Sequence, residues 1–317
     1  MASFRSRLLY AVLACAVAGG GTAAGAVYLN AHADTAAVSS LAAESTAAPE
    51  PTDGEASVAP SAEPAVDRDA LLAKAVAAVS VADGTQMSVA VLDPETGERA
   101  VYGDDAFPTA SIVKVDILAT LLLQAQDAGR SLTSAERAYA TAMIENSDNA
   151  SATALWRTIG GADGLDAANE RFGLTDTAGG DGELWGLTTT TAADQLVLLQ
   201  QVFGSDGELT SASRTYLQGL MGQIADGQDW GVSAAGSSAE LKNGWLPRSA
   251  TGLWVINSVG RVTVDGHELL VAALSQGNAS QAAGISLVEG AAQAAVSVFY
   301  DGGATSSAEP TPAQKSS

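Results

Sequence analysis

Apolar positions follow two different periods along residues 67–300, and their order predicts the fold. Leu, Val and Ala recur at helical spacing between Asp69 and Val81, which indicates an amphipathic helix. The apolar run from Met87 to Leu92 predicts a strand, and a turn after it leads into a returning strand from Arg99 to Tyr102.

The rest of the pattern separates helices from strands. Residues 111–224 are mostly helical in period, with glycines between the segments. Two strands, Leu253–Val259 and Leu269–Leu274, flank a turn, and a last helix runs from about Gln281 to Tyr300. This order predicts a two-lobed α+β fold. An antiparallel sheet is flanked by N- and C-terminal helices, and an all-α lobe is inserted between its strands.

The N-terminal residues 1–33 have the pattern of a targeting segment. Arg5 and Arg7 precede an uncharged stretch from Leu8 to Leu29, and Ala31-His32-Ala33 offers a signal peptidase site. The stretch is also long enough to span a bilayer as an uncleaved anchor, although its many Gly and Ala residues favour cleavage. We therefore expect an exported protein, either secreted or tethered to the outer face of the cytoplasmic membrane.

Two polar segments flank the remaining chain. Residues 34–66 are rich in Ala, Ser, Thr, Glu and Pro and contain no Lys, Arg or aromatic residue, and residues 301–317 form a similar tail. Such compositions bury too little apolar surface to offset the entropy of ordering. The sequence therefore predicts a disordered linker, one domain over 67–300 and a disordered tail. Nothing in the pattern requires a partner chain, so we expect a monomer.

Charge and composition exclude several classes of protein. The formal net charge is −21 over 317 residues, so the chain has no basic surface for a nucleic acid. Its one cysteine, Cys15, lies in the targeting segment and excludes an internal disulfide. Two histidines leave little for a His-based metal site or a Ser-His-Asp triad. We therefore expect no metal and no organic cofactor.

The candidate chemistry begins with Ser111 and Lys114, which follow Pro108 near a predicted helix start. Residues three apart share one face of a helix. In the first turn, the helix dipole favours negative charge and disfavours an ammonium group. A closed pocket there would lower the lysine pKa and let the amine act as a base toward a neighbouring hydroxyl. The same pair also fits a plain helix cap followed by a solvated lysine.

Two further short motifs follow along the chain. Ser147-Asp148-Asn149 stands between two helical stretches and would place a hydroxyl and an amide on one exposed turn. Lys242-Asn243-Gly244 precedes the C-terminal strands, where an edge strand could carry it. Gly244 would let a substrate backbone approach closely. Taken singly, each motif also fits an ordinary capping turn or loop.

In this order, the three motifs resemble the S-x-x-K, S-D-N and K-T-G motifs of class A β-lactamases and penicillin-binding proteins. Phe107-Pro108 before the serine and the Thr-rich segment Leu187–Ala193 are also similar. The resemblance covers essentially all of residues 67–300. It implies a β-lactamase/transpeptidase-like fold and an active-site serine hydrolase that needs no cofactor. It also implies a small-molecule substrate or a peptidoglycan peptide.

The resemblance also implies the catalytic residues. Ser111 would be the acylated nucleophile, and Lys114 would be its base or one half of a proton relay. Ser147 would pass the proton to the leaving nitrogen. Lys242 would neutralise the region around Ser147 and help to attract a substrate carboxylate.

Four further residues are the substrate-binding candidates. The resemblance implies that Asn149 holds the substrate amide. Asn243 and Gly244 belong to the strand motif beside the substrate. The N–H group of Trp245 would complete an oxyanion hole with that of Ser111.

Two departures from the family pattern bear on function. Asn243 replaces the usual hydroxyl residue, which puts carboxylate recognition in doubt. The segment before the Thr-rich stretch also has no E-x-x-L-N motif, whose Glu activates the water that frees the acyl-enzyme. Asp176, Asp181 and Glu183 are the nearby carboxylates, and each fits a solvated loop acid better than a general base.

The sequence therefore predicts an exported serine acyl hydrolase of the penicillin-recognising type, with weak or absent turnover of β-lactams. Two alternatives remain open. One is a non-catalytic cell-wall-binding module that uses the same cleft. The other is a conventional β-lactamase whose general base has moved to another carboxylate.

Overall fold

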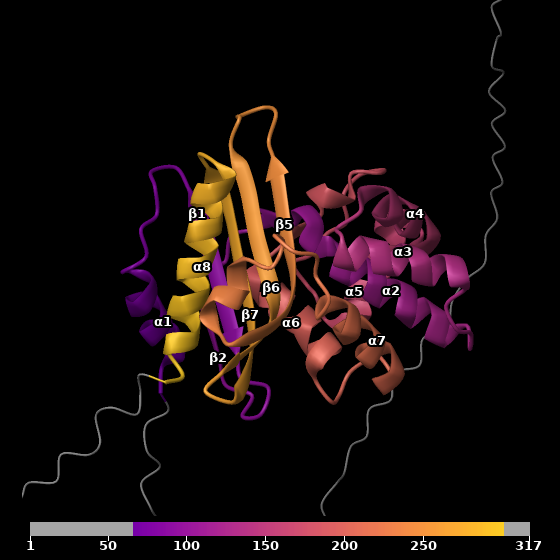
Figure 1. Ribbon diagram of the computed structural model, residues 1–317, viewed down its shortest axis with the longest axis horizontal. Helices are drawn as coiled ribbons and strands as arrows, with labels where there is room; N and C mark the ends of the chain where they lie inside the picture. The colour runs from indigo at the N-terminus through magenta and orange to yellow at the C-terminus, as the bar shows by residue number, and fades with distance from the viewer. Residues whose placement is uncertain (1–65, 301–317) are drawn as a thin grey trace, which may run out of the picture. The chain divides into compact units, whose positions relative to one another are not determined.

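A computed structural model gives the fold, and it describes residues 66–300 (Figure 1). The predicted targeting segment, nearly all of the linker 34–66 and the tail 301–317 lie outside the described residues. The division of the chain into these four parts therefore stays a prediction.

One antiparallel sheet organises the described residues. Its five strands follow the order β2-β1-β7-β6-β5, and a short two-stranded ladder joins β3 and β4. The strands are β1 Gln86–Leu92, β2 Arg99–Tyr102, β3 Phe107–Pro108, β4 Thr189–Thr190, β5 Ser238–Pro247, β6 Trp254–Val264 and β7 His267–Asn278. Because β1 pairs with β7, the beginning and the end of the domain build the sheet together. β5 forms one edge of the sheet beside β6.

Helices lie on both sides of this sheet (Figure 1). The α-helices are α1 Arg68–Val76, α2 Val113–Asp127, α3 Ser134–Glu145, α4 Asn149–Ile159, α5 Gly161–Phe172, α6 Ala192–Phe203, α7 Ser211–Met221 and α8 Gln281–Ser297. Three 3-10 turns complete the described elements: η1 Ala110–Ile112, η2 Trp185–Leu187 and η3 Gly231–Ala235. Helices α2 to α7 form the inserted lobe, since they lie between β3 and β5 in the chain.

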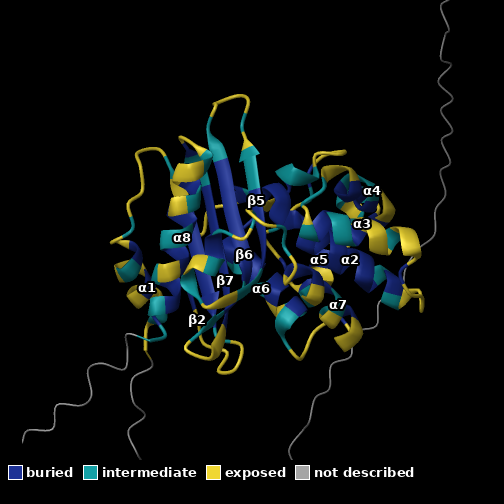
Figure 2. Ribbon diagram, viewed as in Figure 1, coloured by how far each residue is buried: buried dark blue, intermediate teal, exposed yellow. Residues whose placement is uncertain are grey.

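The buried residues form two clusters, one on each face of the sheet. The strands of the sheet are largely dark blue in Figure 2, which marks buried residues. On β7, Leu270, Ala272 and Leu274 pack toward helices α2 to α7. Their neighbours Leu269, Val271 and Ala273 pack toward α1 and α8. This alternation follows from the two-residue period of a strand, and it makes β7 apolar on both faces.

The predicted two-lobed α+β fold is confirmed, and the differences concern the ends of elements. The strands predicted over Leu253–Val259 and Leu269–Leu274 run from Trp254 to Val264 and from His267 to Asn278. The helix predicted over Asp69–Val81 ends at Val76. Beyond that point the backbone switches to i→i+3 hydrogen bonds, as in the 2.8 Å bond from Val79 N to Val76 O. The last helix ends at Ser297 rather than Tyr300 for the same reason. Apolar spacing continues through such tightened turns, so it does not mark the last α-helical residue.

Candidate active site

Ser111 lies in the 3-10 turn η1, directly before α2, and is largely buried. The chain enters this turn through Ala110, whose φ of +49° is in the left-handed region. A side chain makes that conformation unfavourable, so surrounding contacts must hold it. Asn257 on β6 supplies such contacts, because its Nδ2 donates to Pro108 O at 2.8 Å and to Thr109 O at 3.0 Å. The sequence analysis did not single out Asn257.

Lys114 stands in the first turn of α2 and its side chain is fully buried. Its Nζ donates to Ser147 O at 2.7 Å, to Ser147 Oγ at 3.0 Å and to Asn149 Oδ1 at 2.9 Å. These three acceptors match the three donors of an ammonium group. The structure thus brings the first and second sequence motifs together through one amine.

The turn at Ser147 is shaped for this contact. Ser147 has a φ of +56°, again in the left-handed region. The Asp148 side chain caps helix α4 by accepting from Ser151 N at 2.7 Å. Because the cap holds the carboxylate on the helix, the hydroxyl of Ser147 and the amide of Asn149 turn toward Lys114.

The electrostatics of the site are dominated by two buried lysines. Burial and, to a lesser extent, the charge of Lys242 lower the pKa of Lys114 to about 7, against the opposing effect of Asp148. Burial also lowers the pKa of Lys242 to about 7. Lys242 Nζ donates to Asn243 O at 3.1 Å. An amine with a pKa near 7 exists in both forms at neutral pH, which suits a group that must accept and return a proton.

Strand β5 passes directly beside the Ser111 turn. A Cβ atom added to Gly244 would lie 2.8 Å from Ser111 N and 2.8 Å from Thr109 O. Only a residue without a side chain allows this approach between the two backbones. Trp245 follows on the same strand and lines the cavity that also contains Ser111. The predicted oxyanion-hole residues are therefore neighbours in space.

The side chain of Asn243 does not face this cavity. It is fully buried, and its Nδ2 donates to Gln228 O and to Trp230 O, both at 2.8 Å. Both donors of the amide are therefore used to hold the segment before η3 against β5. This geometry gives Asn243 a structural role and does not support the predicted contact with a substrate.

The loop between α5 and α6 forms the opposite wall of the cavity. The cavity has a volume of about 330 Å³. Its lining residues are Ala110, Ser111, Asn149, Thr153, Glu183, Leu184, Trp185, Gly186, Leu187, Trp245 and Leu246. Of the three candidate loop carboxylates, Glu183 lines the cavity, whereas Asp176 and Asp181 are exposed elsewhere on the loop. Glu183 forms an exposed ion pair with Arg157.

Trp185 gives this wall an aromatic face. Lys114 Nζ lies 4.9 Å from the centroid of its ring, which is within the range of a cation–π interaction. The indole Nε1 donates to Thr153 Oγ1 at 3.1 Å. In the sequence, Trp185 could not be distinguished from a tryptophan that only packs in the core.

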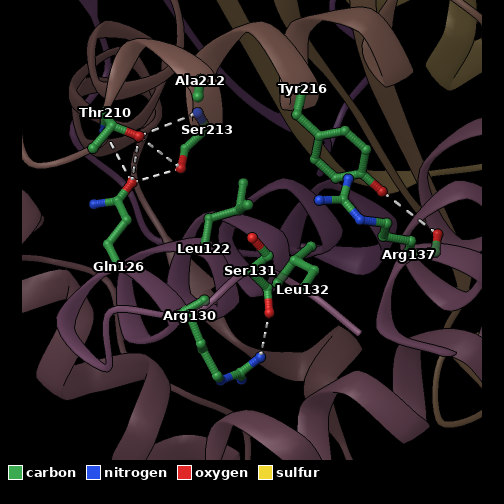
Figure 3. A pocket seen from close by; sticks show the side chains of 11 residues that line it. Leu122, Gln126, Arg130, Ser131, Leu132, Arg137, Thr210, Ala212, Ser213 and Tyr216 are labelled. Carbon is green, nitrogen blue, oxygen red and sulfur yellow. Dashed lines mark hydrogen bonds between the residues drawn. The ribbon is translucent and has the colours of Figure 1, made fainter. Parts of the chain in front are cut away.

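A second hollow of about 230 Å³ lies between α2, α3 and α7 (Figure 3). Gln126 Oε1 accepts there from Thr210 N at 2.9 Å and from Ser213 Oγ at 2.6 Å. Arg137 stacks over the ring of Tyr216 at 5.2 Å. Its lining contains none of the residues of the three sequence motifs.

The fold and the site together define a β-lactamase-type protein. Residues 71–136 and 136–299 match the sequence profile of the Beta-lactamase enzyme family, and the chain belongs to this family. The resemblance predicted from the three motifs is thus confirmed. Membership supports a serine hydrolase type of enzyme, while the roles of the individual residues stay predictions.

Solved structures share the fold at low sequence identity. A β-lactamase from Xanthomonas campestris pv. campestris has a TM-score of 0.58 and 20% identity, over 73% of this chain and 97% of that chain. PBP-A has a TM-score of 0.63 and 18% identity, over 73% and 96% of the two chains. A mutant of PBP-A, solved as an acyl-enzyme complex with penicillin G, has a TM-score of 0.61 and 19% identity, and the match covers 73% of this chain.

Relatives in mycobacteria match a shorter part of the chain. Proteins that carry the name lipoprotein LppW, from Mycobacterium tuberculosis and Mycobacterium bovis, are 29% identical over 131 residues. The match spans 41% of this chain and 42% of those proteins, which is less than half of each. Within residues 66–300, every helix is too short or too polar to cross a membrane.

Proposed function

We propose that the protein is an exported serine acyl-transfer enzyme of the penicillin-recognising type, with Ser111 as its nucleophile. One observation carries the proposal. A fully buried lysine, three residues after a serine that lines a cavity, bonds to both the hydroxyl and the amide of a Ser-Asp-Asn turn. A lysine without a function on a helix is usually exposed to water, because burying an amine costs free energy even when three acceptors bind it.

In the proposed acylation, Ser111 Oγ attacks the carbonyl carbon of an amide or β-lactam. The neutral form of Lys114 takes the hydroxyl proton, and the bond between the carbonyl carbon and the leaving nitrogen breaks. Ser147, which bonds to Lys114 Nζ, delivers a proton to that nitrogen. The N–H groups of Ser111 and Trp245 hold the developing oxyanion. The product is an ester on Ser111 and a free amine.

We propose that hydrolysis of this ester is slow for β-lactams. A water molecule needs a base near the ester, and the loop wall of the cavity consists mainly of Leu184, Trp185 and Leu187. Glu183 is the carboxylate on that wall, but it forms an ion pair with Arg157, which disfavours a role as a base. The acyl-enzyme would therefore accumulate. A mutant of PBP-A, which shares this fold, has been solved as an acyl-enzyme complex with penicillin G.

Intact mass spectrometry of the protein after incubation with a penicillin tests the proposal. We expect a stable adduct on the wild-type protein and none on a Ser111→Ala variant. If the penicillin disappears from solution without an adduct, release is fast and the protein is an efficient β-lactamase. If the penicillin persists and no adduct forms, the proposed acylation is wrong.

A relocated general base remains a second candidate function, because Glu183 lines the same cavity as Ser111. It predicts fast turnover of a chromogenic cephalosporin that is lost in a Glu183→Gln variant. The wall-binding alternative is favoured by the commitment of the Asn243 amide to the protein itself. It predicts binding of peptidoglycan fragments without labelling of Ser111 by any acyl donor.

The proposed location rests on the sequence and on the mycobacterial relatives. Residues 1–33 have the pattern of an export signal. The mycobacterial relatives are named as lipoproteins, which supports export or membrane tethering. Peptidoglycan stem peptides would then be available as acyl donors, and a monomeric enzyme would suffice for the reaction.

A further inference from the structure

Lys114 receives an unusual neighbour from the loop between α5 and α6. Trp185 places its ring 4.9 Å from Lys114 Nζ, on a wall that carries apolar side chains at Leu184 and Leu187. The amine also contacts the Ser147 turn through three hydrogen bonds. Lys114 is thus enclosed by polar acceptors from one element and by an aromatic ring from another.

The ring itself is held in place by two independent contacts. Its Nε1 donates to Thr153 Oγ1 at 3.1 Å, which ties it to helix α4. Trp185 also packs against the apolar cluster of the helical lobe and begins the 3-10 turn η2. Helix α4 begins at Asn149, one of the acceptors of Lys114. The ring and the Asn149 acceptor of the amine are therefore both attached to α4.

We propose that Trp185 is a positioning residue for Lys114: its indole ring stabilises the ammonium form of the lysine and holds the amine against the Ser147 turn. The negative face of an aromatic ring attracts a cation, and most strongly where water is excluded. The proposal rests on the base role proposed for Lys114. It adds that the loop contributes a ring, rather than a carboxylate, to the control of that base.

The charged groups around Lys114 Nζ give little support to its ammonium form, so a contribution from the Trp185 ring matters. Burial and the positive charge of Lys242 on β5 both disfavour the ammonium form, and Asp148 before α4 opposes them. The remaining charged group on the cavity wall, Glu183, is paired with Arg157 and largely exposed. The aromatic ring is thus the feature of the loop that favours a charged Lys114.

The experiment replaces the ring while keeping the site apolar. A Trp185→Leu variant preserves a half-buried apolar neighbour but removes the π face, so the midpoint of the Lys114 titration falls by about 0.5 to 1 pH unit. A Trp185→Phe variant keeps a π face and loses only the bond to Thr153. We expect it to stay close to the wild-type midpoint.

The titration is read by NMR of protein labelled with ¹³C-lysine, which needs no substrate. The chain contains four lysines, so the Lys114 signal is assigned by its loss in a Lys114→Arg variant. A Trp245→Leu variant is the matched control. That residue lines the same cavity, but its ring packs edge-on against Trp230 at 6.1 Å. This control should leave the Lys114 midpoint unchanged.

The outcomes separate this proposal from the proposed function. If Trp185→Leu leaves the Lys114 midpoint unchanged, or if Trp185→Phe shifts it as far as the leucine does, the positioning role is overturned. If penicillin labels neither the wild type nor any variant, the proposed acylation fails, while the NMR titration still decides the role of the ring. Where acylation is measurable, the acylation rate rises with pH, and the midpoint of this rise should shift with the midpoint of the Lys114 titration.

Discussion

A buried carboxyl group in the helical lobe should make the stability of the protein depend on pH. Asp116 stands on α2, two residues after Lys114, and is almost completely buried. Its Oδ2 accepts from Asn169 Nδ2 at 3.1 Å, while its Oδ1 and Asn169 Oδ1 have no hydrogen-bond partner. A proton on Asp116 Oδ1 would turn this unpaired oxygen into a hydrogen-bond donor.

The charges around this carboxyl oppose its ionisation. Burial, opposed by the hydrogen bond from Asn169 and assisted by the nearby Asp166 and Asp194, raises the pKa of Asp116 to about 7. The native protein therefore holds a proton on Asp116 at pH values where the unfolded chain has lost it. Stability from this group is complete below about pH 4 and is lost as pH rises through about 7.

The perturbation is Asp116→Asn, which keeps the shape of the side chain and removes the titration. A pKa raised from 3.8 to about 7 corresponds to about 4 kcal/mol of stability lost by the wild type at alkaline pH. The variant should match the wild type near pH 4. It should become relatively more stable by about 1.4 kcal/mol per pH unit up to pH 7 and then hold a constant advantage.

Urea unfolding followed by tryptophan fluorescence at several pH values measures this difference. The matched control is Asp83→Asn, which removes the same charge from an exposed residue and should give no such slope. A difference between wild type and the Asp116→Asn variant that stays constant from pH 4 to pH 8 would refute the reasoning. It would mean that Asp116 is ionised and solvated in the native protein.

Three further predictions concern the acylation rate. A Gly244→Ala variant should lose at least about 100-fold, because its Cβ would push β5 away from the backbone N of Ser111; stopped-flow labelling measures this. An Asn257→Ala variant should lose about 2 kcal/mol of stability and acylate more slowly, since two carbonyls before Ser111 lose their donor. The pH profile of acylation should be bell-shaped around neutral pH. Lys114 must lose its proton and Lys242 must keep its own, and both have a pKa of about 7.

Each of these three predictions has a control variant or an outcome that would contradict it. Gly219 on α7 has open space where a Cβ would lie, so Gly219→Ala should leave acylation unchanged. Restoring an amide with Asn257→Gln tests whether a longer side chain can still hold the turn. A pH profile that rises steadily through pH 9 would show that the charge of Lys242 does not contribute.

The parts of the fold that the sequence predicted are those with a strong local signal. The strand Arg99–Tyr102 has the predicted bounds, and β1 begins one residue before the prediction, because short apolar runs end at polar turns. The meeting of Lys114 with the Ser147 turn followed from the motif resemblance alone. Spacing along the chain does not say that the two segments touch.

The parts that the sequence did not predict depend on tertiary contacts. Asn257 looks like an ordinary polar residue in a strand, and only the packing of β6 beside the Ser111 turn gives its amide a role. Asn243 was expected to face a substrate, yet the segment before η3 takes both of its donors. The ring of Trp185 reaches Lys114 because a loop folds back over α4. The spacing of apolar residues in the sequence gives no sign of this loop path.

The way in which Asn257 holds the Ser111 turn bears on how this site can diversify. Its amide bonds to the backbone carbonyls of Pro108 and Thr109, and Gly244 likewise contacts backbone atoms. Contacts of this kind constrain the path of the chain but not the identity of the side chains at those positions. Selection can therefore exchange the side chains at Pro108 and Thr109 without displacing the hydroxyl of Ser111.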